Sequence, residues 1–156
     1  VREVAVMGRY GKRRWWRDLK KEDYQLADAA LEKVRMSEFS RRQIGQLSGG
    51  QQQRVFMARA LTQNADILLL DEPFAGVDAA TERAILDVLQ ATKQQGKTVI
   101  VVHHDLSTAA EYFDQIILLK QRLFGFGSPQ QVLKPKLLAD VYEGNMKIFA
   151  ELSNTD

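Results

Sequence analysis

Apolar side chains in the first third of the chain recur with the period of an α-helix. Over residues 20–35 they return every three to four positions, which places them on one face of a helix that can pack against a core. A shorter stripe over residues 1–7 predicts a helix that ends at Gly8. The apolar positions are Tyr24, Ala27, Leu31 and Val34 in the longer stripe, and Val1, Val4 and Met7 in the shorter one.

Short runs of aliphatic and β-branched residues alternate with helical segments through the rest of the chain. We expect strands at residues 66–71, 98–102 and 116–119, and helices at 79–95, 106–113 and from Pro135 to about Tyr142. Asp78 is the expected N-cap of the helix over 79–95, Gly96 ends it, and Ser128 caps a turn that begins with Pro129. This order predicts an α/β domain with buried parallel strands flanked by helices. The inward side chains of the helix over 79–95 are Ile85, Val88, Leu89 and Thr92.

Composition narrows the class of protein. The 156 residues include no cysteine and 45% hydrophobic residues, with a net charge of +2, as in a globular domain that folds without disulfides. The longest apolar runs are far shorter than the about 20 residues of a transmembrane helix. Because the sequence begins at Val1 without a methionine or a leader peptide, we expect a soluble, cytoplasmic chain that is cut off at its N-terminus.

Positive charge is concentrated near the N-terminus, most densely in residues 12–17 (KRRWWR). Interleaved basic and aromatic residues suit a solvated loop, an anionic lipid surface, a protein partner or nucleic acid, and nucleic acid is the least favoured of these three partners. The pattern therefore assigns no role to this segment, and we expect no nucleic-acid partner.

Two adjacent carboxylates, Asp71 and Glu72, follow the aliphatic run of the first predicted strand and precede Pro73. The carboxyl end of a strand in an open α/β sheet is where ligands bind. With Mg²⁺ and a polyphosphate present, one carboxylate can hold the metal while the other orients a water. The alternative is a turn with two solvated acids, and this motif alone favours neither interpretation.

Ser48, Gly49 and Gly50 stand at the start of a strongly helical run that extends to about Leu61. Unpaired N–H groups and the positive end of the helix dipole attract anions there, and glycines let a phosphate approach the backbone. An ordinary serine N-cap with a flexible joint is the alternative. The acidic strand end about 20 residues later favours a phosphate site.

His103 and His104 are the only histidines of the chain, and they follow the predicted strand over 98–102. A histidine at this place can reach a phosphate oxygen or a catalytic water. Because neighbouring strand residues face opposite sides, at most one of the two points to the site, and a packed or capping histidine is the alternative. A metal site built on this pair is disfavoured.

A phosphate-cradling loop of the form G-x-x-x-x-G-K-[ST] is missing from the sequence. The nearest fragment is Gly96-Lys97-Thr98, which has Ala91 where the first glycine belongs and lies between a helix and a strand. The sequence therefore predicts half of a nucleotide site.

Four motifs, in this order and spacing, resemble the ATP-binding subunits of ABC transporters. They are Leu47-Ser48-Gly49-Gly50-Gln51, the strand ending Asp71-Glu72-Pro73, Gly76-Val77-Asp78, and His104-Asp105. The resemblance implies that the segment from Leu47 to Gln51 is the signature motif, which contacts the γ-phosphate of ATP held by a partner subunit. Asp71 is then the Walker B aspartate on Mg²⁺ and Glu72 the general base. Asp78 lies at the dimer interface, and His104 is the switch histidine.

The same resemblance implies a partial P-loop NTPase (RecA-like) core, with ATP and Mg²⁺ as ligands. Residues 1–46 would form a helical subdomain that grips an integral membrane permease, residues 47–125 the signature helix and core, and residues 126–156 the C-terminal helices. Further partners would be a second ATPase subunit in a head-to-tail dimer and a substrate-binding protein, with the complex peripheral to the membrane.

Finer similarities point to the subfamily that imports manganese, zinc, iron or metal chelates; they lie around Met7-Gly8-Arg9-Tyr10 and in residues 102–106. The phosphate loop would precede Val1, so we expect this chain to be inactive alone, with an exposed sheet edge and marginal stability. A soluble non-transport ABC ATPase and a non-catalytic interaction module are the alternatives.

Overall fold

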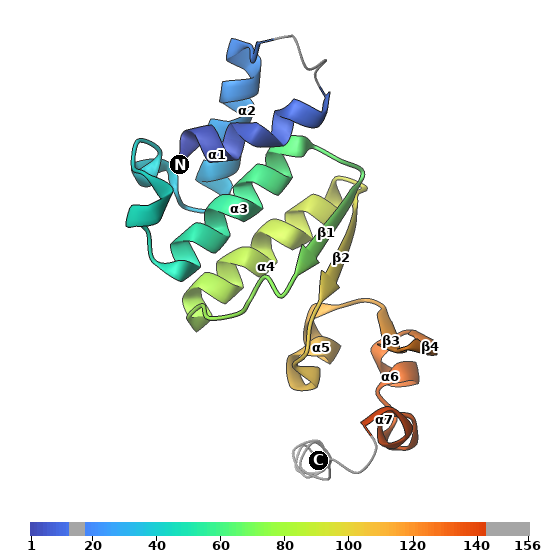
Figure 1. Ribbon diagram of the computed structural model, residues 1–156. Helices are drawn as coiled ribbons and strands as arrows, with labels where there is room; N and C mark the ends of the chain where they lie inside the picture. The colour runs from blue at the N-terminus through green and yellow to red at the C-terminus, as the bar shows by residue number, and fades with distance from the viewer. Residues whose placement is uncertain (13–17, 143–156) are drawn as a thin grey trace. The chain divides into compact units, whose positions relative to one another are not determined.

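The computed structural model describes residues 1–12 and 18–142, which form two compact units divided between Val102 and His103. Figure 1 labels the helices and strands of each unit. Most of the basic segment, residues 13–17, lies outside the described residues, and so does the side chain of Lys12. No helix in the described ranges is both long and apolar enough to cross a membrane.

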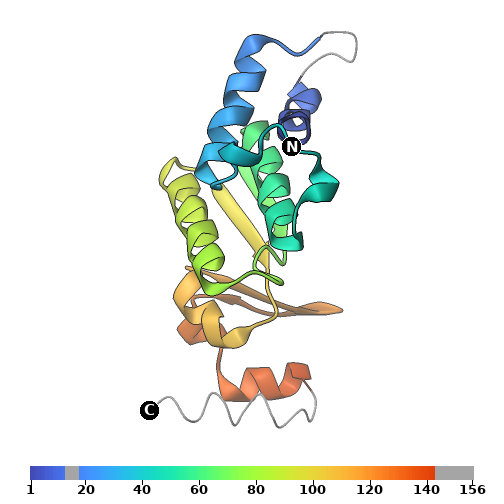
Figure 2. The same cartoon turned by 90° about the vertical axis from the view of Figure 1, so that its left-hand side faces the viewer.

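Three α-helices and three 3₁₀ segments form the N-terminal part of the first unit. They are α1 (Arg2–Val6), the 3₁₀ segment η1 (Met7–Lys12), α2 (Lys21–Lys33) and α3 (Gly49–Gln63), with η2 (Ser37–Phe39) and η3 (Ile44–Gln46) between α2 and α3. Figure 2 shows these elements side by side. The stripe expected on α2 is confirmed at Ala27, Leu31 and Val34, all buried.

The prediction of an apolar stripe over residues 1–7 is only partly correct. Val1 is buried, but Met7 is 45% exposed, and Ala5 and Val6 are buried in place of Val4 and Met7. Val1 and Ala5 are four positions apart and share one side of α1, whereas Met7 begins the 3₁₀ segment, whose tighter turn takes it off that side. At Gly8 a Cβ would lie 2.1 Å from the Arg59 carbonyl oxygen, so η1 crosses α3 too closely for any other residue.

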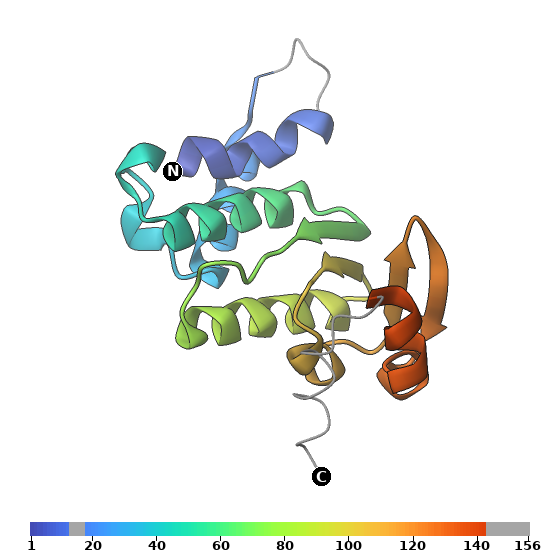
Figure 3. The ribbon, with the colours of Figure 1, turned by 60° about the horizontal axis from the view of Figure 1, so that its bottom comes forward.

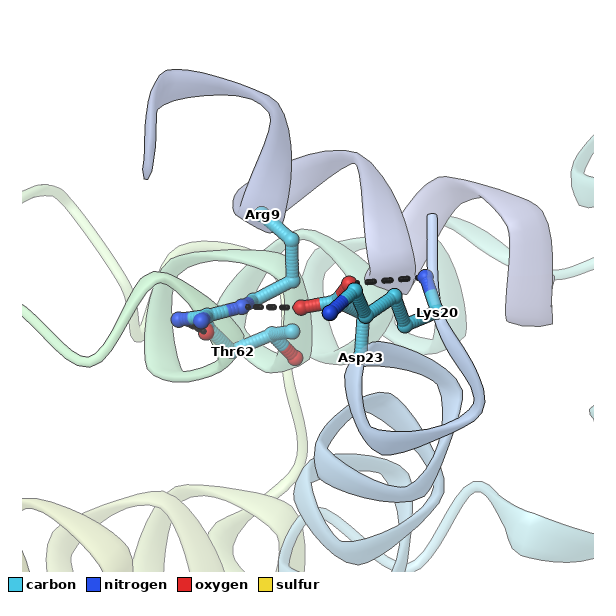
Figure 4. A network of polar contacts seen from close by, with 4 residues as sticks. All are labelled: Arg9, Lys20, Asp23 and Thr62. Carbon is cyan, nitrogen blue, oxygen red and sulfur yellow. Dashed lines mark hydrogen bonds and ion pairs between the residues drawn. The ribbon is translucent and has the colours of Figure 1, made fainter. Parts of the chain in front are cut away.

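A buried ion pair ties this helical part together (Figure 4). Asp23 is 1% exposed and accepts hydrogen bonds from Arg9 Nε and from the Lys20 N–H, both at 2.9 Å. The Arg9 guanidinium also donates to the Thr62 carbonyl oxygen at 3.5 Å. Residues from η1, the start of α2 and the end of α3 therefore share one polar network inside the unit.

The parallel sheet of the first unit has two strands, β1 (Ile67–Asp71) and β2 (Thr98–Val102), in register from Ile67 opposite Thr98 to Asp71 opposite Val102. The connecting helix α4 (Ala79–Gln94) begins after Asp78, and its expected inward residues are buried. In the described residues β1 pairs only with β2. The expected strands, their parallel pairing and α4 are thus present.

The expected burial of the two strands is wrong for six of their ten residues, which are exposed. Leu68 is buried beside residues of α2, α3 and α4, but Ile67 and Leu69 are 61% and 68% exposed, and Ile100 and Val102 on the same face are also exposed. Alternate strand residues point to opposite faces, and the described helices cover only one of them. The apolar side chains on the other face are therefore exposed in the part of the chain that the structure describes, which the expectation of an exposed sheet edge did not include.

The second unit contains α5 (Leu106–Tyr112), β3 (Ile116–Lys120), β4 (Arg122–Gly127), α6 (Pro129–Val132) and α7 (Pro135–Tyr142). Its core is formed by Leu118, Val132, Leu138 and Val141. The third strand was expected in the parallel sheet, but it pairs antiparallel with β4, a strand that the sequence pattern did not predict (Figure 3). Gln121, at φ 57°, makes the tight turn that brings these adjacent segments together.

Candidate functional site

The carboxylates Asp71 and Glu72 lie at the carboxyl end of β1, as expected. Asp71 is the last residue of the strand and is exposed, on the same face as Leu69. Glu72 continues the pairing by one bond, because its N–H donates to the Val102 carbonyl oxygen at 3.0 Å. Two acidic side chains thus leave the sheet at its carboxyl edge.

The backbone of Glu72 has an uncommon conformation, with φ at 43°. A non-glycine residue in this left-handed region costs on the order of 1–3 kcal/mol, and such residues cluster at functional sites. Besides the bond to Val102, its carbonyl oxygen accepts from the Ala75 N–H at 3.1 Å and from Gln53 Nε2 at 2.8 Å. Three hydrogen bonds therefore hold the residue in place.

Helix α3 begins with Ser48 as its N-cap. Ser48 Oγ accepts from the Gln51 N–H at 3.4 Å, and Gln51 Oε1 accepts from the Ser48 N–H at 2.9 Å, which makes a capping box. The first turn carries no acidic side chain, so its dipole is not compensated there. The capping interpretation of Ser48 is thereby confirmed, and the site keeps the positive potential that an anion would require.

The buried side chain of Leu47 fixes this helix start to the unit. Gln52 Nε2 donates to the Leu47 carbonyl oxygen at 3.0 Å. A Cβ at Gly50 would lie 3.4 Å from Val77 Cγ1, and none of the described atoms would come within 4 Å of one at Gly49. Residues 48–50 are therefore next to the segment that begins α4, with open space beside Gly49.

Helix α4 begins differently, because its N-cap is charged. Asp78 accepts from the Thr81 N–H at 2.8 Å and from Thr81 Oγ1 at 3.2 Å. These hydrogen bonds, the backbone one first, lower the pKa of the Asp78 carboxyl below its ordinary value. Gly76, at φ 67°, provides the turn before it. The structure thus brings Gly50, in the first turn of α3, and the segment of Asp78 together within one unit.

Both histidines belong to the second unit. His103 is half-buried, with Nε2 2.8 Å from Thr108 Oγ1 and its ring centroid 5.6 Å from that of Phe113. His104 is exposed. Asp105 caps α5, and its hydrogen bond from the Ser107 hydroxyl lowers the pKa of the Asp105 carboxyl. Of the two, His103 packs against Phe113 and His104 is exposed.

Gln53 was not anticipated as part of the site. The sequence offers one weak signal for it, a polar residue five positions after Ser48 on a helix that has an apolar face. Its contact with Glu72 joins residues 19 positions apart, and no local pattern reports such a contact.

Comparisons with known proteins bear on these motifs. Residues 2–75 match the family model described as ABC transporter. The chain is 54% identical over 154 residues to the manganese transport system ATP-binding protein MntB of Bacillus subtilis, covering 96% of the chain and 62% of the relative. It is 48% identical over 146 residues to the zinc transport system ATP-binding protein TroB of Treponema pallidum, covering 94% and 55%.

Solved structures agree with the sequence matches. A candidate metal-chelate type ABC transporter in an inward-facing conformation superposes with a TM-score of 0.81 at 29% identity, over 90% of this chain and 57% of that one. The dimeric bacterial ABC transporter cassette MJ0796 gives 0.69 at 32% identity, over 81% and 54%.

The matches cover most of this chain but only part of each relative. The chain spans about three fifths of the length of the curated relatives that it matches. Its helices and parallel strands superpose on P-loop NTPase cassettes, in agreement with the expected partial RecA-like core. Residues 2–75 match the ABC transporter family, and the chain is similar in sequence and in fold to the ATP-binding domains of that family.

Proposed function

We propose that this chain is the part of an ABC transporter ATPase that carries the general base and the signature motif, and that the whole subunit hydrolyses Mg-ATP. The observation that carries the proposal is Glu72, fixed by three hydrogen bonds in a left-handed conformation next to Asp71. In this role Glu72 accepts a proton from the water that attacks the γ-phosphate.

The residues at the strand end fit a magnesium ion that is shared with a nucleotide. Asp71 supplies a hard, exposed carboxylate oxygen, as Mg²⁺ prefers. Within residues 1–12 and 18–142 no cluster of three or more such ligands occurs, so Asp71 would hold the ion together with phosphate oxygens and waters. When bound, the ion supplies positive charge to the phosphates.

The start of α3 is proposed to contact the γ-phosphate of ATP held by a second subunit. Leu47, Ser48, Gly49, Gly50 and Gln51 would line this contact. The uncompensated helix dipole and the open space at Gly49 support the assignment. Asp78 would lie at the interface of the head-to-tail dimer; the relative MJ0796 has been solved as a dimer, also with ADP and phosphate.

His104 is proposed as a residue that reaches the γ-phosphate. Its exposed ring, directly after β2 in the sequence, supports this role. Donation from a ring nitrogen to a phosphate oxygen would stabilise the charge that develops during transfer. The catalytic residues of the proposal are therefore Glu72 and His104.

The transported substrate is proposed to be a metal ion or a metal chelate, imported through an integral membrane permease with a substrate-binding protein. The names of the relatives support this, since they include manganese, zinc and chelated iron transport systems. The ATPase would then be cytoplasmic and peripheral to the membrane, with residues 1–46 toward the permease. The chain itself has no phosphate loop and is proposed to be inactive alone.

A chimera tests the function. This chain replaces the matching segment of the Bacillus subtilis MntB relative, and purified chimera is assayed for ATP hydrolysis and, in cells lacking that relative, for manganese uptake. We expect both activities to be restored. A folded chimera that neither hydrolyses ATP nor supports uptake, beside an active MntB control, would contradict the proposal.

A further inference from the structure

The contact between Gln53 and Glu72 connects the N-terminal part of α3 with the end of β1, although the two residues are 19 positions apart in the sequence. Gln53 lies on α3 five residues beyond Ser48, about 1.4 helical turns, and is half-buried. Its side-chain amide donates to the Glu72 carbonyl oxygen at 2.8 Å, a distance typical of a good hydrogen bond. The bond therefore ties the first turns of α3 to the residue that follows β1.

This bond acts on a backbone that would otherwise relax. Glu72, at φ 43°, leaves the left-handed region readily unless its surroundings hold it there. The Val102 carbonyl fixes the N–H side of the residue, while Gln53 and the Ala75 N–H fix its carbonyl side. Because the side chain leaves from between these two peptide groups, their orientation sets the direction of the carboxylate.

We propose that Gln53 is a positioning residue for Glu72, and that it couples the N-terminus of α3 to the general base. The inference rests on the proposed function. Ser48 and Gln53 are on one helix about 7.5 Å apart along its axis, so a shift of the helix start reaches Glu72 through a single hydrogen bond. The helix that contacts the nucleotide of the partner's site thereby adjusts the base of its own site.

Replacement of Gln53 by methionine tests the bond, since the side chain keeps its length but loses the donor. In the chimera described above we expect kcat to fall about 10- to 100-fold while KM for ATP stays within about twofold, because misplacement of a catalytic group lowers turnover rather than binding. The control is Gln63→Met, at an exposed position of the same helix. It should leave both constants unchanged.

A double variant shows whether Gln53 acts through Glu72. Added to Glu72→Gln, the Gln53→Met change should cause no further loss of turnover, because the base that it positions is already absent. A further tenfold loss, a change confined to KM, or an unchanged kcat in the single variant would each overturn the proposal.

A second measurement uses the chain as it stands and is independent of catalysis. Gln53→Met should increase amide hydrogen exchange at Glu72 and Ala75 at least about tenfold relative to Gln63→Met. Unchanged exchange would contradict the contact itself. An inactive chimera with the predicted exchange pattern would instead count against the proposed function and leave the positioning contact supported.

Discussion

The first unit holds acidic side chains in two opposite environments. Asp23 is buried, and its carboxylate is held by Arg9 and by the Lys20 N–H. Asp71 is exposed at the end of β1, and Glu72 beside it is only half-buried, on a backbone that favours glycine. Asp23 therefore uses its charge inside the fold, whereas the pair at the strand end offers charge to a ligand.

This difference in environment assigns Asp23 to the stability of the fold and the strand-end pair, Asp71 and Glu72, to chemistry. A buried charge that loses its partner destabilises the folded state, whereas an exposed carboxylate can be changed with little effect on folding. Variants in the helical part should thus lower stability, and variants at the strand end should lower turnover.

Replacement of Asp23 by alanine should lower the free energy of unfolding by about 3–5 kcal/mol, because the Arg9 guanidinium is left inside the unit without its carboxylate. Urea unfolding followed by circular dichroism measures this. The double variant Arg9→Met/Asp23→Leu, which removes both charges, should lose much less. A loss below about 1 kcal/mol in Asp23→Ala would show that the ion pair is not structural.

Replacement of Glu72 by glutamine should lower ATP turnover of the chimera about 100-fold or more and leave ATP affinity within about threefold. Glutamine keeps the size of the side chain but removes its basic oxygen, so the urea midpoint should barely move. Steady-state hydrolysis and nucleotide titration measure the two quantities. Unchanged hydrolysis would remove Glu72 from the role of general base.

The sequence predicts the helices of this region well, because their apolar periodicity and caps are local. It predicts neither the burial of Asp23, which looks like an ordinary acid in the first turn of α2, nor the Gln53 contact, since both depend on segments far apart in the chain. The motif residues could be named from spacing, but the left-handed backbone of Glu72 could not. β4 was missed because Gly125 and Gly127 interrupt its strand pattern.

Replacement of Glu72 by glycine and by alanine separates the backbone strain from the side chain. Glycine adopts φ 43° without steric cost, so Glu72→Gly should be more stable than Glu72→Ala by about 1 kcal/mol. Urea unfolding of the two variants measures the difference. Equal stabilities would show that the left-handed conformation is relaxed in the folded chain.

The smallest effect concerns the cap of α4 and depends on pH. The pKa of Asp78 is lowered in the folded chain, so the carboxylate stabilises the fold above its unfolded pKa, and this contribution is lost as the pH falls below about 4. The difference in stability between the unchanged chain and Asp78→Ala should therefore be larger at pH 7 than at pH 3. A difference that is the same at both values would contradict the assignment.

The most direct test of the account is a calorimetric titration of this chain with Mg-ATP, together with an assay for released phosphate. If the strand-end acids and the start of α3 are only part of a nucleotide site, millimolar Mg-ATP should produce neither binding heat nor phosphate. Tight binding with turnover would contradict the account, because the phosphates would then be held without a phosphate loop and the roles of Asp71, Glu72 and Ser48 would have to be reassigned.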